Sequence, residues 1–152
     1  MQTVREILED KRHRPLVYVG PESTVFQALQ IMSEADVGAL LVMDMGDIVG
    51  IFSERDYARR VVLQGRTSAG THVREIMTSK VVYVKPEQTI DECMALMTEK
   101  RIRHLPVLED GTVIGVLSIG DLVRATITEQ QFTIDQLVNY IQGQHHGAVA
   151  HE

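Results

Sequence analysis

Residues 17–25 read VYVGPESTV, and residues 82–90 read VYVKPEQTI. The two strings lie 82 − 17 = 65 positions apart, and the match continues at this offset without a gap to Val62 and Ile127. Roughly a third of the aligned positions are identical, which indicates a duplication. Upstream, VREI at residues 4–7 returns at residues 73–76, with 73 − 4 = 69, so the first copy carries four extra residues around 11–14. The chain is therefore a repeated unit.

Each copy begins with the pattern of a short strand followed by a helix. The Val/Tyr-rich run predicts the strand, and Pro-Glu-x-Thr predicts a turn into a helix start. The expected helices have apolar residues at i, i+3, i+4 and i+7, the spacing of one helical face: Val25, Ala28, Leu29 and Met32 in the first copy, and Ile90, Cys93, Met94 and Met97 in the second. Cys93 is thus predicted to be a core residue and not a nucleophile.

A β-hairpin and a second helix are expected to complete each copy. The apolar runs 39–43 and 48–52 flank a polar turn, and so do 105–108 and 113–117, where Asp110-Gly111 favours positive φ. The second helices are expected to begin at Ser53 and Ser118. We predict an α+β fold of two β-α-β-β-α repeats with pseudo-two-fold symmetry. The first covers 1–71 with an N-terminal segment and a linker, and the second covers 72–128.

Residues 129–152 are expected to form a C-terminal helix and a polar tail. The predicted helix runs from Phe132 to Gly143, with Thr133 as its cap. One face carries Ile134, Leu137, Val138 and Ile141, and this face must pack on the module or on a second subunit. The tail histidines lack the fixed spacing of a metal site, so no metal is expected: His145, His146 and His151.

The composition excludes several classes of function. A net charge of -6 and a pI near 5.5 leave no broad basic face for nucleic acid. The longest apolar runs fall far short of the roughly 20 residues that span a bilayer. The N-terminus lacks the apolar run of a signal peptide, and one cysteine cannot form an internal disulfide. We expect a cytoplasmic protein without membrane or nucleic-acid partners.

Both hairpins end in the form G-x-x-S-x-x-D, at residues 50–56 and 115–121. Ser-x-x-Asp after a strand is a variant capping box, which is a purely structural role. The same geometry suits a ligand, because a helix N-terminus attracts phosphate and an aspartate accepts hydrogen bonds from a ribose diol. The two roles are compatible, and the glycine would let backbone approach a ligand closely. A unit of about 60 residues is marginal alone, so the copies should pack together and leave two equivalent clefts.

With the repeat, the hairpins and both strings in place, the chain resembles the cystathionine-beta-synthase (CBS) pair family from Val4 to Ile127. VREIM at residue 73 and RHLPVLEDGTVIGVLSIGDLV from residue 103 carry the same resemblance. It implies paired modules that often dimerise into a flat disc. It also implies binding, without turnover, of AMP, ADP, ATP, NAD(H) or S-adenosylmethionine.

The resemblance also implies site residues. Asp56 and Asp121 would hold the ribose diol, and Ser53 and Ser118 would contact phosphate. Arg103 and His104 are expected as phosphate contacts for the Asp121 site. The Asp56 site has Arg55 within its motif, which leaves two alternatives open: a different phosphate arrangement, or an empty site. The adenine is expected on the opposite copy: near Ser23 and Ala28 for the Asp121 site, and near Gln88 and Cys93 for the Asp56 site.

We therefore expect a non-catalytic regulatory module without a catalytic cofactor. A nucleotide in the cleft would favour one packing of the copies, and of a homodimer, and a separate effector protein would read the difference. One alternative is an interaction protein whose clefts are unoccupied. Another is a nucleotide-processing enzyme, for which His104 is the only candidate base, although none of the common nucleophile, metalloprotease or phosphate-loop motifs occurs.

Overall fold

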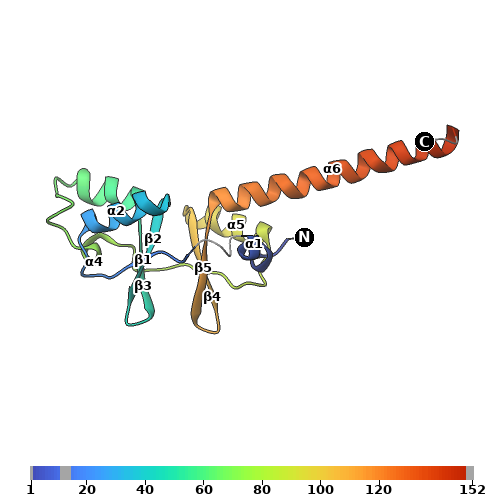
Figure 1. Cartoon of the computed structure of the whole chain (residues 1–152). Helices are drawn as coiled ribbons and strands as arrows, with labels where there is room; N and C mark the ends of the chain where they lie inside the picture. Colours follow the sequence, from blue (N-terminus) through green and yellow to red (C-terminus); the bar gives the residue numbers. More distant parts are fainter. Residues whose placement is uncertain (1, 11–14, 150–152) are drawn as a thin grey trace.

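The structure is a computed structural model that describes residues 2–10 and 15–149, with side chains as far as residue 143. Figure 1 shows two β-hairpins side by side with their turns at the same end, and helices gathered at the opposite end. One long helix then leads away from both hairpins. The predicted α+β fold of two repeats is confirmed.

The first copy follows the predicted order of elements. It contains β1 (Tyr18–Val19), α2 (Val25–Ala35), β2 (Ala39–Asp44), β3 (Asp47–Ser53), α3 (Glu54–Tyr57) and the π-helical turn η1 (Ala58–Val62). β1 pairs with β2 in parallel, and β2 pairs with β3 in antiparallel orientation. Thr24 caps α2 in a reciprocal capping box with Gln27, which confirms the predicted helix start.

The second copy differs in its first strand. It contains α5 (Ile90–Lys100), β4 (His104–Glu109) and β5 (Thr112–Ser118), and Thr89 and Glu92 form the capping box of α5. The expected strand near residue 82 is reduced to a single parallel bridge between Val84 and Val107. Pro106 stands where the first copy has Leu41, and a proline has no N–H to donate to a neighbouring strand. The pairing therefore stops after one residue.

Both hairpins close through two residues with positive φ. Met45 and Gly46 have φ of 51° and 86°, and Asp110 and Gly111 have φ of 51° and 79°. Two successive positive φ angles define the type I′ turn that suits the twist of paired strands. The strand before each turn also contains a register shift at the equivalent place, between Val42 and Met43 and between residues 107 and 108. The duplication is therefore preserved in local geometry.

The copies exchange their short leading helices. α1 (Val4–Asp10) buries Val4 and Ile7 in the core of the second copy. α4 (Val73–Ile76) buries Val73 and Ile76 in the core of the first copy. Each core is therefore completed by a helix from the other half of the repeat, which links the stabilities of the two copies.

Equivalent backbone hydrogen bonds hold both exchanged helices. The Val4 amide donates to the Gln88 carbonyl over 2.9 Å, and the Val73 amide donates to the Ser23 carbonyl over 2.8 Å. Antiparallel bridges Thr3–Thr89 and Thr24–His72 flank these bonds. Each leading helix is thus tied to the turn that opens the following long helix.

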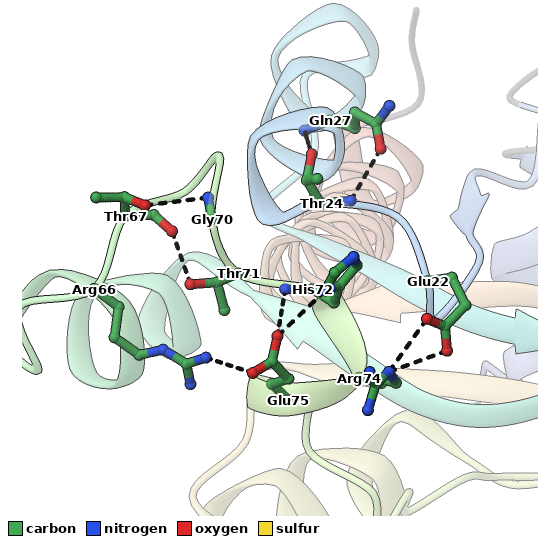
Figure 2. Close-up of polar contacts among 10 residues, drawn as sticks. All are labelled: Glu22, Thr24, Gln27, Arg66, Thr67, Gly70, Thr71, His72, Arg74 and Glu75. Carbon is green, nitrogen blue, oxygen red and sulfur yellow. Dashed lines mark hydrogen bonds and ion pairs between the residues drawn. The ribbon is translucent and has the colours of Figure 1, made fainter.

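The segment that precedes α4 is anchored by ion pairs, as Figure 2 shows. Arg66 Nη2 lies 2.6 Å from Glu75 Oε1, and the His72 amide donates to Glu75 Oε2 over 2.8 Å. These contacts, the His72 amide first, lower the pKa of Glu75 to about 2. Arg74 pairs with Glu22 over 3.0 Å. The linker therefore holds α4 against the first copy.

The end of the chain corrects a prediction. A single helix, α6, runs from Ile119 to Val149, so the separate helix capped by Thr133 is wrong. The Thr133 hydroxyl instead donates to the Glu129 carbonyl over 3.1 Å, one turn back within the helix. The sequence between residues 121 and 142 contains neither glycine nor proline, so nothing interrupts the helix.

Candidate functional site

A cleft of about 470 Å³ lies between the two copies. One wall is the end of β3 with α3, and the other comes from residues around 78–82 and 101–106. Ser53, Asp56 and Arg55 of the first G-x-x-S-x-x-D string all line it. We call it the Asp56 cleft. Its position between the repeats agrees with the sequence expectation.

Asp56 is held in place by several donors and is only 8% exposed. Its Oδ2 accepts hydrogen bonds from the Ser53 amide over 2.9 Å and from the Ser53 hydroxyl over 3.1 Å. The Ser53 hydroxyl in turn accepts from the Asp56 amide over 3.2 Å, which completes the capping box. Thr78 Oγ1 donates to Oδ1 over 3.3 Å. The capping role is therefore confirmed, and the carboxylate is fixed at the cleft wall.

The Asp56 cleft is strongly basic. Its lining contains six Lys or Arg side chains and two acidic ones: Arg55, Arg59, Arg60, Lys80, Arg101 and Arg103, with Glu54 and Asp56. Within residues 2–10 and 15–143, no acidic side chain pairs with Lys80, Arg101 or Arg103. In a protein of net charge -6, such a gathering of cations is a local exception that favours an anionic ligand.

One of these arginines binds the opposite wall, and another binds the end of α4. Arg55 Nη1 donates to the Arg101 carbonyl over 3.0 Å, across the boundary between the copies. Arg60 Nη1 donates to the carbonyls of Ile76 and Met77 over 3.1 Å each, and its Nε lies 3.9 Å from Asp56 Oδ1. The Arg55 contact fixes the two walls relative to each other, so the cleft is preformed.

A second cleft, of about 270 Å³, occupies the pseudo-symmetric position. It is lined by Ser118 and by residues 36–39, where Asp36, Gly38 and Ala39 replace Arg101, Arg103 and His104 of the other copy. His104 borders both clefts. Because the second cleft lacks the arginines, the two sites differ in charge although their backbones correspond.

Asp121 lies apart from this second cleft. It is 4% exposed and lines a separate cavity of about 220 Å³ together with Arg124, Gln2 and Asp10. The Asp121 Oδ1 accepts from Arg124 Nη2 over 2.6 Å, and Oδ2 accepts from the Ser118 amide over 2.7 Å. The predicted equivalence of the two aspartates therefore holds for helix capping, but Asp121 and Ser118 face different cavities.

The predicted grouping of Arg103 with Asp121 is wrong. The structure places Arg103 in the lining of the Asp56 cleft, together with Arg101 and His104. The pseudo-two-fold arrangement turns the residues before β4 across the boundary, toward the end of β3 of the other copy. Adjacency in sequence to the second motif was therefore misleading, and the Asp56 site has the cations that we expected for its twin.

The four predicted adenine contacts do not line either cleft. Ala28 and Cys93 are fully buried in the two separate cores. Ser23 and Gln88 instead accept the backbone bonds of the exchanged helices. The interpretation of Cys93 as a core residue is confirmed, and burial raises the pKa of its thiol to about 11.

Sequence reasoning missed Thr78, Lys80 and Arg101. Thr78 contacts Asp56 directly, and Lys80 and Arg101 line the same cleft.

The motif glycines lie against side chains of the protein itself. A Cβ at Gly50 would lie 2.6 Å from Met77 Sδ, and a Cβ at Gly115 would lie 2.7 Å from Leu8 Cδ2. These glycines make room for the protein's own Met77 and Leu8 side chains.

The part of the chain that the structure describes has no helix long and apolar enough to cross a membrane. It also has no group of three His, Cys, Asp or Glu side chains arranged to hold a metal ion. The preformed, basic cleft between the copies is therefore our candidate functional site.

Two solved structures share this architecture. A CBS-domain structure from Burkholderia ambifaria MC40-6 is 56% identical, with a TM-score of 0.82, and the match covers 88% of this chain and 99% of that one. The CBS domain pair of protein MJ0100, solved with 5′-methylthioadenosine and S-adenosyl-L-methionine, has a TM-score of 0.74 at 23% identity. That match covers 85% of this chain and 98% of the other, and at this identity it shows the fold alone.

Sequence relatives carry the same domain. The CBS domain-containing protein CBSX3, mitochondrial, of Arabidopsis thaliana is 44% identical over 127 residues, or 80% of this chain. The match spans 62% of that relative's own length. The family model for the CBS domain matches twice, at residues 4–63 and 73–127, and proteins with paired CBS domains are typically regulatory. The chain therefore belongs to the CBS domain family and contains a tandem pair of its repeats.

Proposed function

We propose that this chain is a regulatory module that binds an adenosine nucleotide in the Asp56 cleft. The observation that carries the proposal is a buried, fixed carboxylate in a preformed cleft, beside Lys80, Arg101 and Arg103, which pair with no acidic side chain among the described residues. A ribose offers hydroxyl donors and a phosphate chain offers negative oxygens, so the two halves of a nucleotide match the two kinds of group in the cleft.

The Asp56 carboxylate supplies the ribose contact. An ionised carboxylate has about four acceptor positions, and the protein's own donors use two on Oδ2 and one on Oδ1. The remaining capacity on Oδ1 accepts a ribose hydroxyl. Because the capping box already fixes the carboxylate, ligand binding does not have to order this side chain.

The cations supply the phosphate contacts. Lys80, Arg101 and Arg103 reach the cleft from the second copy, and Arg55 and Arg59 reach it from the first. Removing one charge-assisted hydrogen bond costs about 1.5–3 kcal/mol, or about ten- to a hundredfold in affinity. We therefore expect affinity to rise with phosphate number, from AMP through ADP to ATP, with NAD(H) as a further candidate. S-adenosylmethionine, which carries a positive sulfonium, should bind weakly.

Occupancy of the Asp56 cleft is proposed to act without turnover. A nucleotide contacts both copies, so it favours the packing in which Arg103 and Asp56 face each other, and an effector protein senses that packing. The proposed assembly is a homodimer. The cytoplasmic location stays a prediction, and the Arabidopsis relative is named as mitochondrial.

Thermal shift with a panel of AMP, ADP, ATP, NAD, NADH and S-adenosylmethionine tests the proposal. A ligand at 100 times its Kd adds about 2.7 kcal/mol, and for a chain of this size that raises Tm by roughly 5–10 °C. Isothermal titration should then show a ten- to hundredfold loss for Arg103→Gln and for Asp56→Asn. Arg74→Gln is the control for the first, because Arg74 pairs with Glu22 and does not line the Asp56 cleft.

Asp121→Asn is the matched control for Asp56→Asn, because both aspartates cap a helix but only Asp56 lines the basic cleft. Equal losses in the two variants would contradict our choice of cleft. If no nucleotide raises Tm, the alternative of an interaction protein with unoccupied clefts is favoured. Measurable hydrolysis that His104→Asn abolishes would favour an enzyme.

A further inference from the structure

The outer part of α6 has no support from the rest of the described chain. Every residue from Ile127 to Gly143 is exposed, although the helix begins against the module with Leu122 fully buried. Figure 1 shows this part leading away from both hairpins. An isolated helix shorter than about 12–15 residues is marginal in water, and longer ones owe most of their stability to packing of an apolar face. A partner for this helix would therefore stabilise it.

One face of α6 is apolar along most of its outer length, with Gln130 as its polar member. The exposed fractions of the six aliphatic side chains on it run from 42% to 63%: Val123, Ile127, Ile134, Leu137, Val138 and Ile141. At 3.6 residues per turn they fall within a sector of about 100°. Leu122 and Ala125, which pack on the second copy, lie on a different side of the helix. We call this face the α6 stripe.

The α6 stripe has the seven-residue spacing of a coiled coil. Ile127, Ile134 and Ile141 recur every seven residues, at the position named a, and Val123, Gln130 and Leu137 occupy the position named d. Isoleucine at a favours two parallel strands when leucine occupies d, and here one of the three d positions, Leu137, is leucine. The pattern from Val123 to Ile141 extends over between two and three heptads.

We propose that the α6 stripe binds the same helix of a second copy of this chain, as a parallel two-stranded coiled coil. In a parallel pair each residue meets its own equivalent, so Ile134 meets Ile134 and Gln130 meets Gln130. In an antiparallel pair, where a positions meet d positions, Gln130 would face Ile141. Only the parallel arrangement keeps polar with polar and apolar with apolar.

Charge and area also fit a second copy. The flanking e and g positions from residue 126 to 140 are uncharged: Thr126, Gln131, Thr133, Val138 and Tyr140. Arg124, at the e position beside Val123, pairs with Asp121 of its own helix. A half-exposed aliphatic side chain offers on the order of 100 Å². Six of them on each of two helices give about 1,200 Å², the lower end of the range for a stable specific interface.

Disulfide trapping in the full chain tests the proposed contact. Ile134→Cys places a thiol at an a position, where the two equivalents adjoin, and Asn139→Cys places one at the outermost f position of the same helix. The native Cys93 is buried and does not compete. Mild oxidation should convert most of the Ile134→Cys protein to a covalent dimer and leave most of the Asn139→Cys protein monomeric.

Equal cross-linking of the two variants, or none in either, overturns the proposal. Cross-linking that appears only when Ile134→Cys is mixed with Leu137→Cys also overturns it, because that result requires the antiparallel pair.

Sedimentation equilibrium gives an independent measurement. The double variant Ile134→Lys/Leu137→Lys disrupts the α6 stripe, and Gln136→Lys/Asn139→Lys makes the same charge change on the opposite side. The stripe variant should raise the dimer dissociation constant at least a hundredfold, and the control should leave it unchanged. Equal dissociation constants, or a wild-type chain that stays at 17.1 kDa at tens of micromolar, would refute the pairing and leave the stripe to another partner.

Discussion

Replacing Ile7 with alanine tests the exchange of leading helices. Ile7 is 5% exposed and packs in the core of the second copy, more than seventy residues away along the chain. Isoleucine to alanine in a core costs about 2–5 kcal/mol, through lost transfer free energy and the cavity that remains. With a urea m value of about 2 kcal/mol/M, the unfolding midpoint should fall by roughly 1–2.5 M.

The copy that loses hydrogen-exchange protection shows whether α1 packs on the second copy or on its own copy. In native-state hydrogen exchange, amides of β4 and β5 should lose more protection in Ile7→Ala than amides of β2 and β3. Ile76→Ala should show the reverse. Glu6→Ala, an exposed change on the same helix, should shift stability by less than about 0.5 kcal/mol. If Ile7→Ala matched Glu6→Ala, or loosened the first copy instead, the exchanged arrangement would be refuted.

Three further predictions concern single groups. Gly50→Ala should lower the free energy of unfolding by about 1–3 kcal/mol in urea titration, because the added Cβ meets Met77 and the backbone of Thr78. Cys93, whose burial raises its pKa to about 11, should resist thiol reagents at pH 8 until denaturant exposes it. The pKa of Glu75 is lowered from 4.5 to about 2, so its contribution to stability is present above pH 4.5 and disappears as pH falls toward 2. Glu75→Gln should accordingly destabilise at pH 7 and make no difference at pH 2.

Local features of the fold could be predicted because local residues determine them. Asp110-Gly111 predicted the second hairpin turn, and the threonines of the Pro-Glu-x-Thr segments proved to cap α2 and α5. The continuous α6 could also have been anticipated, since no breaker residue occurs near Thr133. Threonine can cap a helix N-terminus, but within a helix its hydroxyl can instead donate to a carbonyl of the preceding turn, as Thr133 does.

The composition of the site could be predicted only in part. Asp56 and Ser53 were identified from their motif. Arg103 was assigned to the wrong cleft, because sequence order does not say which of the two clefts between the repeats a residue faces. The exchange of α1 and α4 has the same cause, since a short amphipathic helix fits equally well on either of two similar cores. Lys80 carries no local pattern at all, and only its place in three dimensions brings it to the cleft.

The exchange of α1 and α4 has a consequence for synthesis on the ribosome. The core that contains Phe52 lacks Val73 and Ile76 until the α4 segment has emerged, and Val4 and Ile7 have no apolar surface to cover until the second copy follows. Chains grow from the N-terminus at about 5–20 residues per second, so α1 waits for several seconds with its apolar side uncovered. Neither half of the gene would therefore encode a piece that matures independently of the other.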